Sequence, residues 1–225
     1  SHSLQEVRQI GEKLKEVAKV EVPTLVKYAE VVPYLVETGK ELVNRELGIG
    51  KLGNRKSSIE NRKSTWCMLI DYDKGGEKKV LAAALYRFGE MTFDNALRHV
   101  KSLKKAERAD LAERLLGHLG RFDEPLRELE YCTYTFDLVM DQGAYAEFRR
   151  HRMMTQTPQS LTTRLGYATP RLITESGFGS RYEAAMDAAA EMYEKLYPFH
   201  PQVAQYVVPN GFNRRVLAQF NLRSA

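Results

Sequence analysis

Apolar residues recur every three or four positions in the first part of the chain, at Val7, Ile10, Leu14 and Val17. This spacing predicts an amphipathic helix, because it places the apolar side chains on one face. Pro23 and Pro33 then interrupt the pattern. These two prolines predict that a short second helix spans 24–32 and that a third spans 35–47.

A short apolar run of strand type follows at 66–72, and Asp73, Gly75 and Gly76 predict a turn after it. The Ala- and Leu-rich segment 80–88 predicts a buried helix. Two further helices are predicted over 95–103 and 105–119. In the second, one apolar stripe is formed by Leu111, Leu115, Leu116 and Leu119.

Two later segments alternate with the period of two that is typical of strands. The first, 131–140, has its apolar positions at Cys132, Tyr134, Phe136 and Leu138. The second has apolar Phe212, Val216, Ala218, Phe220 and Leu222, a face that Arg214 interrupts. Its other face carries Asn213, Arg215, Gln219, Asn221 and Arg223. Such a face is either exposed to solvent or lines a polar site, and the period leaves both open.

Helical patterns and one long loop lie between these two strands. A helix is predicted over 144–152, and the hydroxyl-rich segment 153–180 is predicted to be a loop. A helix over 181–197 should bury Tyr182, Ala185, Met186, Ala189, Tyr193 and Leu196. A short helix follows at 202–208. Together these elements predict an α+β fold, with a mixed or antiparallel sheet flanked by helices.

Composition excludes several classes of protein. No apolar run reaches the roughly 18 residues of a membrane span, and no apolar N-terminal stretch is typical of a signal peptide. Cys67 and Cys132 are the only cysteines, which excludes a disulfide framework and a four-cysteine zinc site. We therefore expect a reduced, cytoplasmic setting. The net charge of +5 permits an anionic partner without identifying one.

The segment 51–64 is rich in Lys and Arg, but no aromatic residues lie between the cations. Nucleic-acid sites use aromatic side chains as stacking platforms. We therefore interpret this segment as a solvated linker and expect no nucleic-acid partner.

The densest charge of the folded part is Arg149-Arg150-His151-Arg152, and hydroxyl residues and Arg164 follow it. Guanidinium groups bind phosphate through paired hydrogen bonds, and hydroxyls and loop amides complete a phosphate site. The pattern suits a nucleotide or a phosphorylated cofactor. The alternative is an exposed helix end, where cations are also favourable. No second His lies near His151, so we expect no metal site.

Arg150-His151-Arg152, then seven residues, then Ser160 resembles the signature of the flavin-dependent thymidylate synthases. Other segments follow in that family's order. Residues 66–88 are similar to its opening strand and helix, and 130–136 (EYCTYTF) are similar to its Glu-His-x-x-Phe-Thr-Phe strand. Residues 204–209 and 221–223 are similar to its late helix and strand. The resemblance therefore spans about 66–225.

The resemblance implies an FAD-dependent methylation of dUMP to dTMP, with NADPH as reductant and methylenetetrahydrofolate as one-carbon donor. No protein nucleophile is implied, so the protein binds and orients its ligands. By resemblance the FAD-binding residues are Arg150, His151, Arg152 and Asn221. The residues at dUMP or a related nucleotide are Ser160, Thr162, Arg164 and Glu147. The family's sites are shared between subunits, which implies a homo-oligomer or pairing with a sister synthase-like copy.

Several positions depart from the family pattern. Glu147 replaces the usual Gln and is unfavourable for an approaching phosphate. Thr162 and Gln205 each stand where an Arg is usual, and Tyr131 replaces the strand His. Inside the seven-residue gap the usual Ser, Asn and Glu are Thr155, Thr157 and Pro158. Two functions remain open: an active synthase, or a degenerate copy that keeps the fold for FAD or nucleotide binding or for assembly.

The first residues, SHSLQEVR, are similar to a segment that follows the synthase domain in the family. We therefore expect residues 1–50 to be a helical segment that ends a preceding synthase-like copy. A basic linker would follow at 51–65, and a C-terminally incomplete synthase-like domain at 66–225. Proteolysis, an incomplete chain and an unrelated N-terminal helix after a tag remnant are the alternatives.

Overall fold

The computed structural model describes residues 4–21, 23 and 66–224. The chain divides into two compact units, the first comprising 1–62 and 192–207 and the second 63–191 and 208–225. The helices predicted over 24–32 and 35–47 and the linker predicted over 51–64 lie outside the described residues. No described helix is long and apolar enough to cross a membrane.

The first unit contains the predicted N-terminal helix, α1 (Gln5–Glu21). The helix predicted over 202–208 is divided into α10 (Pro201–Ala204) and a 3-10 turn, η4 (Gln205–Val207). The Tyr206 hydroxyl donates to Glu6 Oε1 over 2.6 Å and so joins η4 to α1. The long helix α9 (Gly179–Leu196) continues from the second unit into this one.

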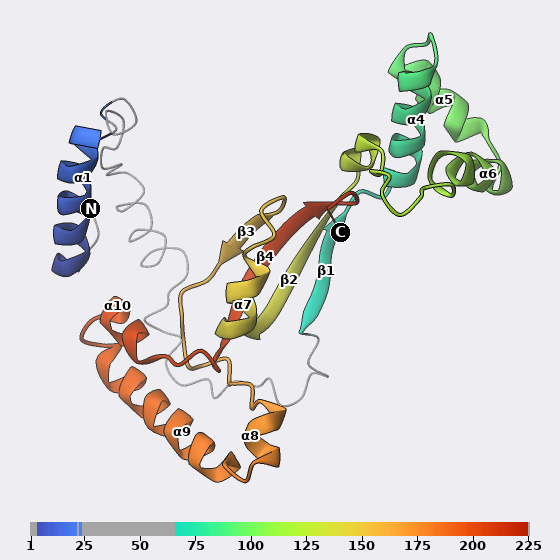
Figure 1. The fold of residues 1–225 in the computed structure, drawn as a ribbon. Coiled ribbons are helices and arrows are strands. Elements are labelled where there is room, and N and C mark those ends of the chain that lie inside the picture. Colours follow the sequence, from blue (N-terminus) through green and yellow to red (C-terminus); the bar gives the residue numbers. More distant parts are fainter. Residues whose placement is uncertain (1–3, 22, 24–65, 225) are drawn as a thin grey trace. The chain divides into compact units, whose positions relative to one another are not determined.

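An antiparallel sheet of four strands forms the centre of the second unit (Figure 1). The strands are β1 (Cys67–Tyr72), β2 (Thr133–Asp141), β3 (Thr155–Pro158) and β4 (Asn213–Asn221). Their order across the sheet is β1-β2-β4-β3, and every neighbouring pair is antiparallel. The predicted α+β fold is confirmed, and of the two predicted sheet types the antiparallel one is present.

The two faces of the sheet differ as the alternation predicts. On one face Leu138, Val216 and Ala218 are buried, and the rings of Phe136 and Phe220 stack at 5.3 Å. The short helix α7 (Gln142–Phe148) lies against this apolar face and buries Tyr145 (Figure 1). The opposite face carries the polar residues of β2, β3 and β4, including Thr135, Asp137, Thr155, Arg215 and Gln219.

Three helices follow β1 and pack together: α4 (Gly76–Phe88), α5 (Phe93–Ser102) and α6 (Lys105–Leu116). Their core is formed by Leu81, Ala82, Ala96 and Val100, with Leu111 and Leu115 packed against it. The stripe predicted along α6 is wrong at Leu119, whose side chain is 42% exposed. The helix ends at Leu116 with Gly117 as its C-cap, so Leu119 lies beyond the last turn.

The helix predicted over 144–152 is displaced. Asp141 caps its N-terminus, because Asp141 Oδ1 accepts from the Ala144 amide over 2.8 Å. The helix then ends at Phe148, so the Arg150-His151-Arg152 segment lies in turns. The predicted position of this segment at the end of a helix is therefore wrong by one turn.

The segment 153–180 is not one loop, because it contains β3 and a short helix, α8 (Arg171–Glu175). The strand has the sequence TQTP, which has no apolar alternation to reveal it. Its position at the edge of the sheet explains how a terminal proline is tolerated there. In α9 Met186 and Tyr193 are buried as predicted, but Ala185 is exposed.

The junction of β1 and α4 gives a stability prediction. Gly76 begins α4 and is buried, and a methyl group there would overlap Cys132 Sγ. Gly76→Ala should lower the free energy of unfolding by about 1–3 kcal/mol, measured by urea denaturation. Gly75→Ala is the matched control, since Asp73 Oδ1 at 3.8 Å is its nearest neighbour. Equal effects of the two substitutions would contradict this account.

Candidate functional site

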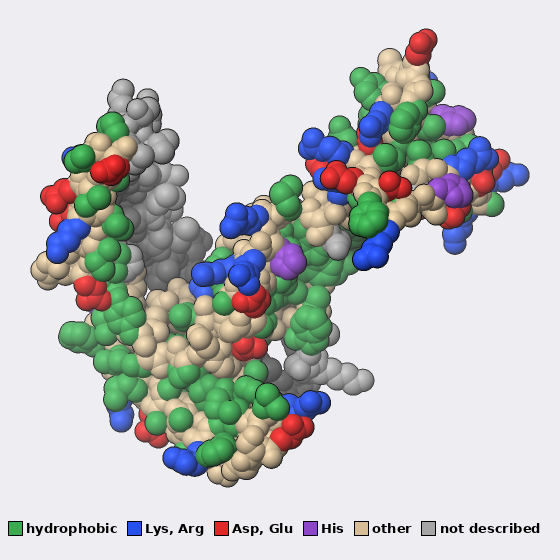
Figure 2. Space-filling view, in the orientation of Figure 1, with side chains coloured by type: hydrophobic (Ala, Val, Ile, Leu, Met, Phe, Trp, Pro, Cys, Tyr) green, Lys and Arg blue, Asp and Glu red, His purple; other side chains and the backbone are tan. Residues whose placement is uncertain are grey.

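The Arg150-His151-Arg152 segment forms a turn directly after α7. The Arg150 amide donates to Glu147 O over 3.0 Å, and the His151 amide donates to Phe148 O over 3.1 Å. All three side chains of the segment are exposed. Figure 2 shows Lys and Arg side chains gathered near a His side chain over α7 and β3. The predicted basic cluster is therefore a surface feature that external anions can reach.

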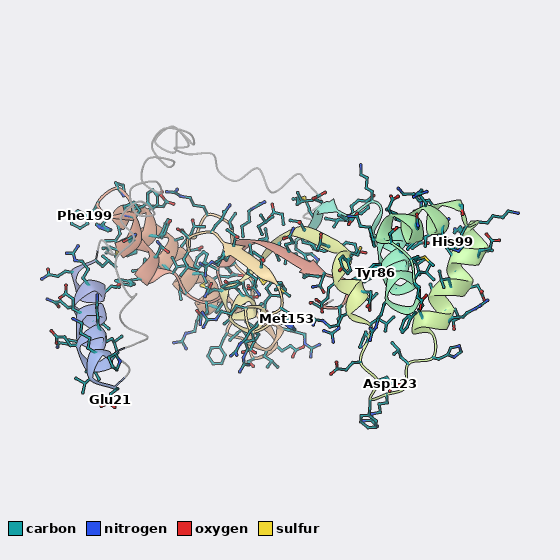
Figure 3. All side chains as sticks on the ribbon, turned by 90° about the horizontal axis from the view of Figure 1, so that it is seen from above. Glu21, Tyr86, His99, Asp123, Met153 and Phe199 are labelled. Atoms are coloured by element: carbon teal, nitrogen blue, oxygen red, sulfur yellow. The ribbon has the colours of Figure 1, made fainter. Side chains whose placement is uncertain are left out.

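A cleft of about 400 Å³ opens beside this turn, where β3 begins and β4 ends. Met153, labelled in Figure 3, is 70% exposed at its rim. The cleft is lined by Thr133, Arg152, Met153, Met154, Thr155, Gln219, Phe220 and Asn221. Arg152 and Asn221, which are 69 positions apart in the sequence, therefore share one cleft.

The polar groups of the cleft suit an anionic ligand that also carries hydroxyl or carbonyl groups. Among the described residues, Arg152 has no ion-pair partner. Asn221 Oδ1 accepts from the amide and the hydroxyl of Ser224, at 3.0 and 2.9 Å, which orients the Asn221 amide group. Gln219 Nε2 donates to Thr135 Oγ1 over 3.3 Å. The cleft thus offers one guanidinium beside amide and hydroxyl groups that local hydrogen bonds hold in place.

Arg150 is engaged differently from Arg152. Its Nη1 lies 2.5 Å from Glu147 Oε2, and both side chains are 73% exposed. An exposed ion pair of this kind contributes about 0–1 kcal/mol. Glu147 therefore neutralises one of the two motif arginines, although an incoming phosphate could displace it.

Three of the four residues predicted at the nucleotide, Ser160, Thr162 and Arg164, lie further along β4. The fourth, Glu147, lies in α7 and pairs with Arg150 instead. The Gln159 amide donates to Arg215 O over 2.9 Å, which places Ser160 beside the first half of β4. Thr162 Oγ1 accepts from the Arg164 amide over 3.1 Å and so forms a local turn. Gln159, directly before this Ser160–Arg164 loop, is four residues after Thr155, or about 13 Å along the strand at ~3.3 Å per residue.

The predicted site residues therefore fall into two groups. The motif turn and Asn221 lie together at one end of β4, and the loop that carries Ser160, Thr162 and Arg164 lies beside the other end. Gln205, which stands where the family has an Arg, is the first residue of η4 in the other unit.

Arg214 is a residue of this region that sequence reasoning did not assign. Its Nε donates to Gln159 O over 2.8 Å, and its Nη1 donates to Gln142 Oε1 over 3.0 Å. Its guanidinium lies 4.8 Å from the centroid of the Tyr145 ring. Burial, with the nearby charge of Arg149 as a smaller cause, lowers the pKa of Arg214 from its ordinary value. An arginine on the apolar face of a predicted strand was the signal that could have identified it.

Arg215 lies on the opposite face and pairs with Asp137 across the sheet, with Nη1 and Oδ2 2.6 Å apart. The other carboxylate oxygen, Asp137 Oδ1, is buried without a hydrogen-bond partner in the described structure. The polar face of the sheet is thus organised by an internal ion pair.

Tyr131, which replaces the strand His of the family, lies outside the cleft. It precedes β2, at the end of a 3-10 helix, η3 (Arg127–Tyr131). It lines a second groove, of about 830 Å³, with Tyr86, Phe93 and the Arg87–Glu128 ion pair, which measures 3.2 Å. Within the described residues, no group of three His, Cys, Asp or Glu side chains could hold a metal ion.

Comparison with known proteins identifies the family. Residues 68–225 match the family described as thymidylate synthase complementing protein. The chain belongs to this family.

Curated relatives share sequence with the chain, and a solved structure shares its fold. A UPF0159 protein of Chlamydia muridarum is 30% identical over 232 residues, which is 99% of this chain and 42% of the relative. A second UPF0159 protein, of Thermoplasma acidophilum, is 24% identical over 100% of this chain and 44% of its own length. The chain thus spans less than half the length of these curated relatives. The UMP/dUMP methylase PolB of Streptomyces cacaoi, solved with 5-Br dUMP, has a TM-score of 0.53. It is 17% identical and covers 70% of this chain and 73% of its own, so it supports the fold.

The contacts of Arg214 give a prediction for this region. Arg214→Met keeps the aliphatic stem but removes the bonds to Gln159 and Gln142. We expect a loss of about 2 kcal/mol in the free energy of unfolding, since one of two charge-assisted hydrogen bonds is to a backbone carbonyl. Denaturant titration measures it. Arg171→Met, which breaks an exposed pair with Glu175, is the control and should cost less than 1 kcal/mol. A loss no larger than the control's would refute the assigned role.

Proposed function

We propose that this domain binds FAD and a uridine nucleotide as part of a flavin-dependent methylation of dUMP to dTMP. The observation that carries the proposal is the cleft shared by Arg152 and Asn221. Family resemblance assigns both residues to FAD, and their positions in the sequence are far apart. Their convergence beside an exposed Arg-rich turn is what an FAD site requires.

The residues present fit a dinucleotide. Arg152 offers a guanidinium to a pyrophosphate, and Asn221 and Gln219 offer amide groups to the sugar or the ring. Thr133 and Thr155 add hydroxyls on the same side of the sheet. When bound, FAD supplies hydride transfer. The chain's own residues bind the phosphates and orient the rings.

The nucleotide would lie at the second group of residues. Ser160 and Arg164 offer a hydroxyl and a guanidinium to a phosphate or a base, and Gln159, directly before them, lies about 13 Å along the strand from Thr155. This separation exceeds the span of one phosphate but suits two neighbouring ligands. NADPH and methylenetetrahydrofolate are the co-substrates in this proposal, by family resemblance.

The second candidate is a copy that keeps the fold and FAD binding but turns over poorly. Glu147 favours it, because family resemblance places this residue at dUMP, where a carboxylate repels an approaching phosphate. Thr162 adds to this, since it stands where the family usually has an Arg and brings no guanidinium to a phosphate. The two candidates share FAD binding and differ in turnover.

Assembly belongs to the same proposal. We infer a homo-oligomer, or pairing with a sister synthase-like copy, since the cleft is open and family resemblance implies sites that are shared between subunits. A second copy would then supply the wall that this chain leaves open. Light scattering at micromolar concentration tests this inference.

Removal of the Arg152 guanidinium tests the cofactor site. Arg152→Ala should weaken FAD binding about 10- to 150-fold, because one charge-assisted contact contributes roughly 1.5–3 kcal/mol. Flavin fluorescence titration measures the dissociation constant. Arg171→Ala removes an exposed arginine of α8 and should leave the constant unchanged. An unchanged dissociation constant for Arg152→Ala would show that this cleft does not bind FAD. A wild-type protein that takes up no FAD would refute the proposed function.

Release of tritium from 5-tritiated dUMP separates the two candidates. We expect little release by this chain alone, with FAD, NADPH and methylenetetrahydrofolate supplied. Thr162 and Gln205 stand at two positions where the family usually has an Arg. The loss of two charged contacts would raise the dissociation constant for dUMP from the micromolar towards the millimolar range. Turnover comparable to that of active family members would eliminate the degenerate-copy candidate.

The charge of Glu147 gives a matched substitution for the same assay. Glu147→Gln should tighten dUMP binding about fivefold, since family resemblance places Glu147 at the nucleotide and the substitution removes a carboxylate that repels its phosphate by about 1 kcal/mol in water. Glu175→Gln, which breaks a similar exposed pair in α8, should have no effect. Equal dUMP affinities in the wild type and Glu147→Gln would show that the Glu147 carboxylate does not restrict the nucleotide site.

A further inference from the structure

We propose that Gln156 is a positioning residue, which fixes the turn carrying Arg150, His151 and Arg152 and so aims Arg152 into the cleft. The inference deepens the proposed FAD site and rests on it for its effect on binding. The effect on the turn itself is independent of any ligand.

The contacts of the Gln156 side chain carry the proposal. Its Nε2 lies 3.3 Å from Phe148 O and 3.2 Å from His151 O, and it donates to both carbonyls. The Phe148 carbonyl, at the last residue of α7, also accepts from the His151 amide, so the Gln156 amide adds a bond from a separate strand to this local one. One amide group thereby joins the last residue of α7 to the central residue of the motif.

The sheet explains how this side chain reaches the turn. Gln156 is the second residue of β3 and pairs with Ala218 of β4, which is fully buried. It therefore points to the apolar face of the sheet, where α7 lies, whereas Thr155 and Thr157 point to the polar face. Gln156 is half-buried, so packing restricts its rotamers and the amide has few alternative positions.

The other described contacts of the turn are made with α7 itself, and they include the Glu147–Arg150 ion pair and a tilted contact of the Phe148 and His151 rings at 6.1 Å. Its backbone hydrogen bonds, from Arg150 to Glu147 and from His151 to Phe148, run back along the chain to α7. In the described structure, Gln156 makes both side-chain hydrogen bonds to the Phe148 and His151 carbonyls. The hydrogen bonds from Gln156 of β3 therefore hold the turn beside the cleft, where Arg152 lies three residues before Thr155.

Hydrogen exchange of the unliganded protein tests the positioning directly. Gln156→Leu keeps the volume but removes both donors, and Gln156→Glu keeps the shape but presents a carboxylate to two carbonyls. Both should raise amide exchange at residues 149–152 at least about tenfold, at unchanged exchange in β2 and β4. Gln159→Leu is the matched control, because it makes the same Gln-to-Leu change three residues after Gln156, at a side chain that is exposed.

A double-substitution cycle on FAD affinity tests the consequence for binding. Gln156→Leu should weaken FAD about tenfold, and the double variant with Arg152→Ala should bind no more than about twofold weaker than Arg152→Ala alone. A role limited to stability would give additive losses. Gln159→Leu should leave the affinity unchanged.

The outcomes separate this inference from the proposed function. Unchanged exchange at 149–152 in both Gln156 variants overturns the inference, and so do additive losses in the cycle. A wild-type protein without FAD binding rejects the proposed function. In that case the exchange result alone decides whether Gln156 holds the turn.

Discussion

The structure depends on the antiparallel pairing of β4 with its two neighbours. Nine consecutive residue pairs join β4 to β2, and four more join it to β3. This pairing buries Val216 and Ala218 against α7 on one face and sets the polar residues in rows on the other. The motif turn, the Ser160 loop and α7 each bond to β3, to β4 or to a side chain that these strands carry.

Two polar side chains on the apolar face of the sheet attach the neighbouring loops and α7 to the strands. Gln156 holds the turn after α7, and Arg214 holds both the start of α7 and the segment before Ser160. Each is a polar group at a position where alternation calls for an apolar one. Burial makes their hydrogen bonds more costly to lose, which explains how a short surface helix and two loops keep a defined arrangement.

Much of this arrangement could be predicted from the sequence. The alternation in 131–140 and 212–222 identified both central strands and their faces, because one side of each is buried. The edge strand β3 could not be found this way, since TQTP carries no hydrophobic period. The end of α7 was also missed, because Arg149–Arg152 continue a helical composition while the chain turns toward β3. The family signature located Arg152 and Asn221, but only the ladder brings them together, and their roles stay predictions.

The seven-residue gap in the signature is a length that the sheet imposes. It consists of two residues that turn, four residues of β3 that pair with β4, and Gln159, whose amide also bonds to β4. Adding or removing one residue between Arg152 and Gln156 would shift the strand by one position and reverse its two faces, so that the Gln156 side chain would point away from α7. The number of residues between Arg152 and Ser160 therefore sets two properties of the candidate site. It sets the distance between the two groups of residues and, because side chains alternate along a strand, the side of the sheet that each group faces.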